Sequence, residues 1–160
     1  MEKKYVSMDP WTEALLYIAA RKQHLNDVII PALKEGKIVI CDRFMDSTSV
    51  YQGYARGLGI RTVDEVQRTV IGSTQPDLTL FFDLTVEEAR KRKISRFEES
   101  DRLDLENRDF FVKVHEGYQV LIGDNVDRIK VIDAEKPLKN VIEEAFLQIK
   151  DKIKDIKESV

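Results

Sequence analysis

The feature that most constrains the fold is the alternation of segments with helical periodicity and short β-branched or aromatic runs. Three such runs lie at 37–41, 78–84 and 128–133, and helical segments separate each one from the next. Parallel strands need long crossover connections, which are usually helices. The order of elements therefore predicts an α/β fold with a mostly parallel sheet. We expect the run at 37–41 to be a strand that is buried on both faces.

Helical periodicity predicts the segments between these runs. The first helix begins after Asp9, an N-cap residue followed by a proline, and Gly36 ends it. Pro31 is expected to kink this helix or to end its regular part. Thr85 and Glu88 have capping-box spacing at the start of a strongly basic helix. Further helices are predicted near 46–54, 63–72, 104–123 and 137–157.

Length and charge exclude several classes of protein. The chain has 160 residues, which suits one domain, and its 26 Lys and Arg against 29 Asp and Glu argue against a nucleic-acid binder. No apolar run approaches the length of a membrane span, and the first residues lack the apolar core of a signal peptide. Cys41, the only cysteine, is expected inside the strand as a buried thiol and fits a reducing compartment. These observations predict a cytoplasmic protein.

A charged pair follows the first predicted strand. Asp42 and Arg43 come directly after it, and ligands of open parallel sheets gather beyond the carboxyl ends of the strands. An arginine can grip a phosphate with two hydrogen bonds, and a carboxylate near phosphates can hold Mg²⁺ through water. An ordinary ion pair at a strand end is the alternative, and the dipeptide alone leaves both interpretations open.

Polar side chains that could hydrogen-bond to a nucleobase follow this pair within one to two helical turns. Ser47 and Thr48 supply hydroxyls, Tyr51 a phenol and Gln52 a carboxamide. A carboxamide can both donate to and accept from the amide edge of a pyrimidine. The alternative is a polar helix start before a glycine-rich surface loop. That alternative explains the composition but not the position of these groups directly after Asp-Arg.

The combined pattern resembles one family. The residues Asp42-Arg43-Phe44 and Tyr51-Gln52-Gly53 are similar to the Asp-Arg-Tyr and Tyr-Gln-Gly segments of bacterial thymidylate kinases. The helix at 12–21 resembles the Thr-Glu-x-x-Leu-x-x-x-Ala-x-Arg helix of that family. Further matches in family order are Pro76-Asp77, Arg102-Leu103-Asp104 and Glu116-Gly117-Tyr118. The resemblance covers about residues 9–157 and is more specific than any single motif.

The resemblance implies a fold and an activity. The fold is the P-loop kinase-like (nucleoside-monophosphate kinase) three-layer α/β/α arrangement with a parallel sheet, here as one partial domain over 1–160 with a lid at 94–104. The activity is that of a phosphotransferase, which moves a phosphoryl group from ATP, with Mg²⁺ as cofactor, to dTMP and gives dTDP for dTTP biosynthesis. The implied partners are dTMP, ATP and a second copy in a homodimer, without nucleic acid or membrane.

The resemblance also assigns roles to individual residues. Base and sugar contacts fall to Tyr17, Arg21, Ser47, Thr48, Tyr51 and Gln52. Arg43 would hold the dTMP phosphate, and Asp42 would hold Mg²⁺ through water. The lid arginines that would bind ATP are Arg90, Arg92, Arg96 and Arg102. The implied catalytic set is Asp42, Arg43, Arg92 and Arg96.

The sequence departs from the family in one respect. Nothing in it matches the phosphate-binding loop Gly-x-x-x-x-Gly-Lys-Ser/Thr, and the family's first two strands, including the central one, are expected to be missing. We therefore expect a truncated or split gene product, and the sequence leaves open whether a companion chain supplies this loop. The alternative is a non-catalytic nucleotide-binding module. A deoxynucleoside kinase is a third interpretation, against which Tyr51-Gln52-Gly53 argues.

Overall fold

The computed structural model describes residues 8–72, 74–95 and 106–158. The chain divides into two compact units. Unit 1 comprises residues 1–75 and 100–118, and unit 2 comprises residues 76–99 and 119–160. Residues 96–104 of the predicted lid lie outside the described residues.

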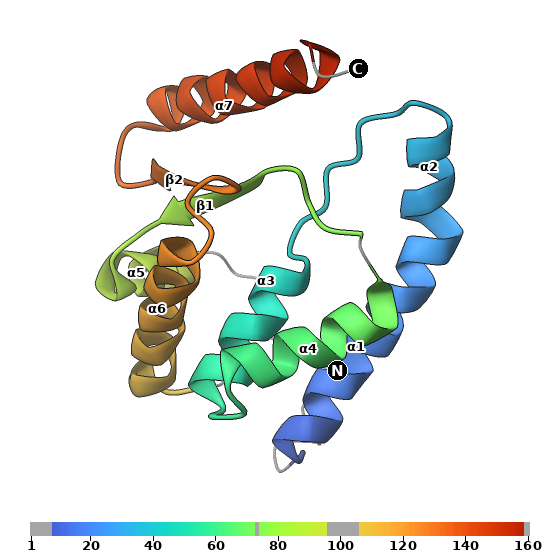
Figure 1. Cartoon of the computed structure of the whole chain (residues 1–160). Helices are drawn as coiled ribbons and strands as arrows, with labels where there is room; N and C mark the ends of the chain where they lie inside the picture. The colour runs from blue at the N-terminus through green and yellow to red at the C-terminus, as the bar shows by residue number, and fades with distance from the viewer. Residues whose placement is uncertain (1–7, 73, 96–105, 159–160) are drawn as a thin grey trace. The chain divides into compact units, whose positions relative to one another are not determined.

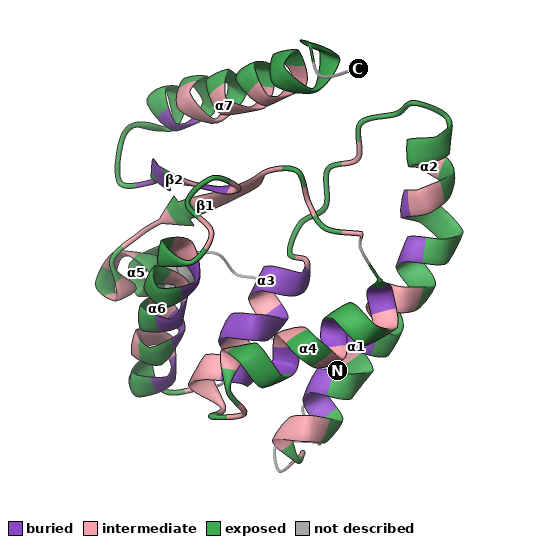
Figure 2. Cartoon of the chain, viewed as in Figure 1, coloured by how far each residue is buried: buried purple, intermediate pink, exposed green. Residues whose placement is uncertain are grey.

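Unit 1 is helical in its described part. Its elements are α1 (Pro10–His24), the π-helical turn η2 (Leu25–Ile29), α2 (Ile30–Lys34), α3 (Met45–Thr48), the π-helical turn η3 (Ser49–Ala55), α4 (Ile60–Ile71) and the first part of α6 (Arg108–Gly123). Helix α4 crosses α1 (Figure 1). Buried residues line α1, α3 and α4 (Figure 2). A core cluster joins Leu25 and Ile29 of η2 to Met45 of α3 and Ile71 of α4.

The first predicted helix is confirmed, together with the effect of its proline. The Asp9 carboxylate accepts a hydrogen bond from the Thr12 backbone N–H at 3.0 Å, which caps α1. The turn before Pro31 widens into η2, where the N–H of Ile30 bonds to the carbonyl of Leu25. A proline in a regular helix clashes with the carbonyl four residues earlier, and the wider π turn accommodates this change of path.

The predicted strand at 37–41 is wrong. The segment is extended, but within the described residues no strand pairs with it, and backbone pairing is what makes an extended segment a strand. Val39 packs against the core cluster, whereas Ile38 and Ile40 are 67% and 86% exposed. The segment is therefore not buried on both faces. Cys41 is exposed as well, so the predicted buried thiol is also wrong.

Unit 2 contains the parallel pairing that the sequence predicts. Strand β1 (Thr79–Asp83) pairs in parallel with β2 (Ile129–Asp133), and Phe81 lies opposite Val131 in the register. The helices of this unit are α5 (Val86–Ser95), the end of α6, and α7 (Leu138–Glu158). The second and third predicted strands are therefore confirmed, as is the crossover between them.

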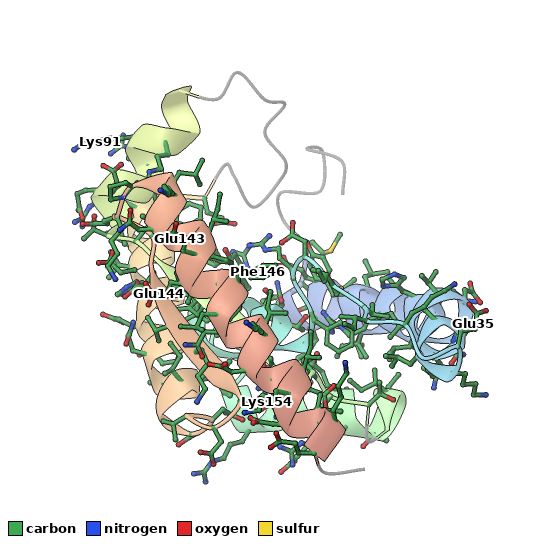
Figure 3. All side chains as sticks on the ribbon, turned by 90° about the horizontal axis from the view of Figure 1, so that it is seen from above. Glu35, Lys91, Glu143, Glu144, Phe146 and Lys154 are labelled. Atoms are coloured by element: carbon green, nitrogen blue, oxygen red, sulfur yellow. The ribbon has the colours of Figure 1, made fainter. Side chains whose placement is uncertain are left out.

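An apolar groove runs along α7 within unit 2. It encloses about 870 Å³ and is lined by side chains from β1, α5 and α7, among them Phe82, Leu138, Val141 and Phe146. Phe146, labelled on α7 in Figure 3, is 67% exposed. Phe82 at the end of β1 is 49% exposed. Part of the apolar surface of β1 and α7 therefore faces solvent.

The contact between α6 and η3 in unit 1 yields a stability prediction. A Cβ added at Gly117 would lie 2.9 Å from the Cβ and Cγ atoms of Tyr54, closer than real side chains approach. We expect Gly117→Ala to lower the free energy of unfolding by about 1–3 kcal/mol, because the ring must shift. Urea denaturation would measure the change.

The matched control is Gly123→Ala, the same substitution at the end of the same helix. No atom lies within 4 Å of a Cβ at Gly123, so we expect this variant to be as stable as the parent or slightly more so. Equal stability of the two variants would contradict the assigned contact with Tyr54.

Candidate functional site

Arg43 stands in an unusual backbone conformation at the start of the candidate site. Its φ of 60° lies in the left-handed region, and Arg43 is the one non-glycine residue with a positive φ among those described. Its guanidinium carbon lies 4.6 Å above the centroid of the Tyr51 ring. Tyr51 in turn meets Phe110 edge to face, with ring centroids 6.0 Å apart. The aromatic pair supports an exposed arginine that has room to meet an anion.

Arg21 makes a second set of contacts, which joins three parts of unit 1. Its Nη2 donates to the hydroxyl of Thr48 at 2.8 Å and to the backbone carbonyl of Phe44 at 3.0 Å. Its Nη1 donates to the Oε1 atom of Gln67 on α4 at 2.6 Å. The guanidinium also lies 5.2 Å from the centroid of the Phe44 ring. Arg21 and Thr48, both predicted to read the base, therefore lie in direct contact.

Burial changes the electrostatics of Arg21. Desolvation lowers the pKa of its guanidinium from the usual range to about 10, and the nearby Cys41 and Asp46 side chains offset part of this effect. The side chain remains charged at neutral pH, because its pKa stays well above 7. A charge that is largely removed from water must be hydrogen-bonded, which explains the three acceptors around it.

Ser47 meets a tyrosine that the predicted set did not contain. Its hydroxyl lies 3.1 Å from the hydroxyl of Tyr118 on α6. Burial raises the pKa of the Tyr118 phenol, against a smaller opposing effect of the hydrogen bond from Ser47. The phenol is thus neutral at physiological pH and can both donate and accept a hydrogen bond.

Gln52 is buried and bonded to a buried carboxylate. Its Nε2 atom donates to Oε1 of Glu13 on α1 at 2.5 Å. Arg56 bridges Oε2 of Glu13 at 3.4 Å and Oε1 of Glu106 at 2.6 Å, and it stacks on Phe110 with 4.6 Å between guanidinium carbon and ring centroid. This network ties α1, η3 and the residues before α6 together around a carboxylate with no solvent exposure.

The remaining predicted site residues belong to both units or lie outside the described residues. Tyr17 is half-buried on α1, one turn before Arg21, and Asp42 is exposed beside Arg43. Arg90 and Arg92 belong to α5 in unit 2, where Arg92 bonds to Glu88 at 2.9 Å and to the carbonyl of Ala134 at 3.0 Å. Arg96 and Arg102 lie outside the described residues.

The sequence analysis did not assign a role to three polar residues of these networks. They are the buried Glu13 and Gln67 and the partly buried Arg56. The position of Gln67 in the sequence could have indicated its burial, because it lies one helical turn from both Val63 and Ile71, which are buried on the same face of α4. A polar residue at such a position on an apolar helix face needs a hydrogen-bonding partner. The partner itself was not readable, since Arg21 lies 46 residues away along the chain.

The described residues contain no group of three or more His, Cys, Asp or Glu side chains that could hold a metal ion. A single exposed carboxylate at Asp42 fits Mg²⁺ nonetheless, because this ion keeps several waters and takes most of its other ligands from substrate phosphates. In the described ranges, no helix combines the length and apolar character that a bilayer span needs.

Parallel strands joined by helices, with an Asp-Arg pair after an extended segment, are found in nucleoside-monophosphate kinases with the P-loop kinase-like fold. A family model described as thymidylate kinase matches residues 1–145. The chain belongs to the thymidylate kinase family.

Individual relatives agree with the family match. The chain is 51% identical to a thymidylate kinase of Mycoplasma capricolum subsp. capricolum over 156 residues, covering 97% of this chain and 73% of the relative. It is 51% identical over 153 residues to that of Mesoplasma florum, covering 96% and 72%. It is 48% identical over 157 residues to that of Bacillus velezensis, covering 98% and 74%.

The backbone at Arg43 yields a second stability prediction. Both Arg43→Gly and Arg43→Ala remove the guanidinium, but only glycine adopts a positive φ without strain. We expect the glycine variant to be more stable than the alanine variant by about 0.5–1 kcal/mol, since relief of strain exceeds the entropy that glycine adds to the unfolded chain. Parallel urea denaturation of the two variants would measure the difference.

The control is the same pair of substitutions at Glu65, an exposed residue in the middle of α4. Glycine should be the less stable variant there by about 1 kcal/mol, because alanine is the better helix former. The same order of stability at both positions would contradict the left-handed conformation of Arg43.

Proposed function

We propose that unit 1 forms the dTMP site of a thymidylate kinase, which transfers a phosphoryl group from MgATP to dTMP and gives dTDP. The observation that carries the proposal is the contact of Arg21 with Thr48 at 2.8 Å, across 27 residues of chain, in the same unit as Arg43 on Tyr51. One pair offers donors and a hydroxyl to a pyrimidine ring, and the other offers a cation to a phosphate. Membership of the thymidylate kinase family supports the assignment.

Each residue has a distinct task in this proposal. Arg43 holds the dTMP phosphate, and the Tyr51 ring beneath the guanidinium fixes the direction of the charge. Tyr51 also packs against the deoxyribose, where a ring close to C2′ excludes a ribose hydroxyl. Tyr17 stacks on the thymine ring that Arg21 and Thr48 read. Gln52 contributes its carboxamide oxygen, since its nitrogen donates to Glu13.

The phosphoryl transfer itself needs positive charge on the equatorial oxygens of the transferring group. Asp42 would hold Mg²⁺ through water, and the ion would neutralise part of the charge that develops on the phosphates. Further positive charge would come from the lid arginines, with Arg92 and Arg96 next to the transferring phosphoryl group. The lid arginines are Arg90, Arg92, Arg96 and Arg102. A companion chain would supply the glycine-rich loop that binds the ATP phosphates.

The proposal includes a cytoplasmic homodimer. Leu15, Leu16, Val28 and Leu33 are each about half exposed along α1, η2 and α2. A row of exposed large apolar side chains on one stretch of helix supports burial against a second copy.

The direct test is calorimetric titration of the purified chain with dTMP, with dUMP and the ribonucleotide TMP as comparison ligands. We expect dTMP to bind more tightly than either. We also expect Arg43→Ala to weaken dTMP binding about 30- to 150-fold, because an arginine–phosphate contact contributes about 2–3 kcal/mol.

The matched control is Arg61→Ala, which removes an exposed arginine of α4 from the same unit and should leave dTMP affinity unchanged. Unchanged dTMP affinity in Arg43→Ala would remove Arg43 from the role of phosphate anchor. Absence of dTMP binding by the parent chain would contradict the proposed site as a whole.

A further inference from the structure

Gln67 has no solvent exposure, and both the oxygen and the nitrogen of its carboxamide form hydrogen bonds within the protein. Its oxygen accepts from Nη1 of Arg21 at 2.6 Å. Its nitrogen donates to the hydroxyl of Ser49 at 3.0 Å and to the carbonyl of Met45 at 3.3 Å. The nitrogen also lies 3.4 Å from a carboxylate oxygen of Asp64. A buried amide with this many partners holds one orientation.

The contact with Gln67 constrains Arg21 in a way that its other contacts do not. Thr48 and Phe44 both accept from Nη2, and a guanidinium held at one nitrogen can still pivot about that point. Gln67 holds Nη1, and two anchored nitrogens fix the plane of the group. The direction in which the remaining N–H donors of Arg21 point therefore depends on Gln67.

The second end of the carboxamide connects this orientation to the rest of the site. Met45 and Ser49 belong to α3 and η3, the elements that directly follow Arg43. Ser49 also donates a short hydrogen bond to Asp64, and burial raises the pKa of that carboxyl. The Gln67 side chain thus links the guanidinium of Arg21 to the backbone segment that follows Arg43, the proposed phosphate-binding residue.

We propose that Gln67 is a positioning residue for recognition of the nucleobase, which acts through Arg21 and makes no contact with the nucleotide itself. The inference rests on the proposed function, in which Arg21 reads a pyrimidine. Its consequence is specific: loss of Gln67 should weaken the part of the binding that comes from the base and spare the part that comes from the phosphate and sugar.

The test compares two ligands, dTMP and 2-deoxyribose 5-phosphate, which lacks the base. Both are titrated calorimetrically into the parent chain and into Gln67→Met, which keeps the length and shape of the side chain but removes its hydrogen bonds. We expect dTMP affinity to fall about tenfold and the affinity for 2-deoxyribose 5-phosphate to stay within about twofold. Thr69→Val, at an exposed position of the same helix, should change neither.

A double-mutant cycle with Arg21→Met identifies the route of the effect. If Gln67 acts through Arg21, then Gln67→Met should cause no further loss of dTMP affinity once Arg21 is gone. Equal and independent losses from the two substitutions would overturn the proposal. So would a loss in Gln67→Met that is the same for both ligands, which a general structural role predicts.

Gln67→Glu provides a rescue variant that stays informative even if the methionine variant fails to fold. It keeps an oxygen acceptor for Arg21, loses the donors to Met45 and Ser49, and brings a second carboxyl close to that of Asp64. We expect its dTMP affinity to lie within about threefold of the parent value. A Gln67→Glu affinity as low as that of Arg21→Met would overturn the role of the Arg21 contact.

The outcomes also separate this inference from the proposed function. A parent chain that binds dTMP, with Gln67→Met binding it equally well, would overturn the role of Gln67 alone. A parent chain that binds 2-deoxyribose 5-phosphate as tightly as dTMP, or neither ligand, would overturn base recognition at this site and the role of Gln67 with it.

Discussion

The burial of the Arg21 guanidinium is the constraint on which the rest of unit 1 depends. A charge that leaves water costs several kcal/mol unless hydrogen bonds replace its hydration. Here the replacements come from three places in the chain, namely Thr48, the carbonyl of Phe44 and Gln67. Because each acceptor must lie within hydrogen-bonding distance of Arg21, these contacts restrict how α1, α3 and α4 pack together. The lowered pKa of Arg21 records the cost of desolvation that these contacts offset.

A second buried charge acts in the same way at the other end of η3. Glu13 has no solvent exposure, and Gln52 and Arg56 supply its hydrogen bonds. Arg56 also binds Glu106, so the network reaches the residues that lead into α6. Truncating one partner of such a network leaves a buried charge unpaired, which costs about 3–5 kcal/mol. The π-helical turn η3 is therefore held from both sides by polar contacts that are too costly to lose.

Secondary structure could be predicted from the sequence where it depends on the local spacing of apolar residues. The prediction was wrong where an element also needs a pairing partner from a distant part of the chain. The helices and the two parallel strands follow from apolar spacing, caps and β-branched runs, and all of these were predicted. The segment at 37–41 has the same β-branched composition, but a strand also needs a paired neighbour, which composition cannot supply. Ile40 is consequently exposed where a buried side chain was expected.

The candidate site shows the same division. The direct contacts of Arg21 with Thr48 and of Arg43 with Tyr51 join residues that the family resemblance had already grouped. Two further partners were not grouped, namely Glu13, which bonds to Gln52, and Gln67, which bonds to Arg21. They lie 39 and 46 residues from these partners, so no local pattern in the sequence links them. Gln67 was detectable only as a polar residue on an apolar helix face, which signals a partner without naming it.

The costly conformations of unit 1 lie in or directly beside the segment that its two polar networks hold. Arg43 has a positive φ that an L-residue adopts at a cost of about 1–2 kcal/mol, and η3 departs from regular helical hydrogen bonding a few residues later. Such conformations persist only where the surroundings over-determine them. The Arg21 network fixes the chain at Phe44 and Thr48, and the Glu13 network fixes it at Gln52 and Arg56. With these four positions set, the backbone around Arg43 and Tyr51 has little freedom to relax, which would lower the cost of ordering this backbone when the proposed phosphate ligand binds.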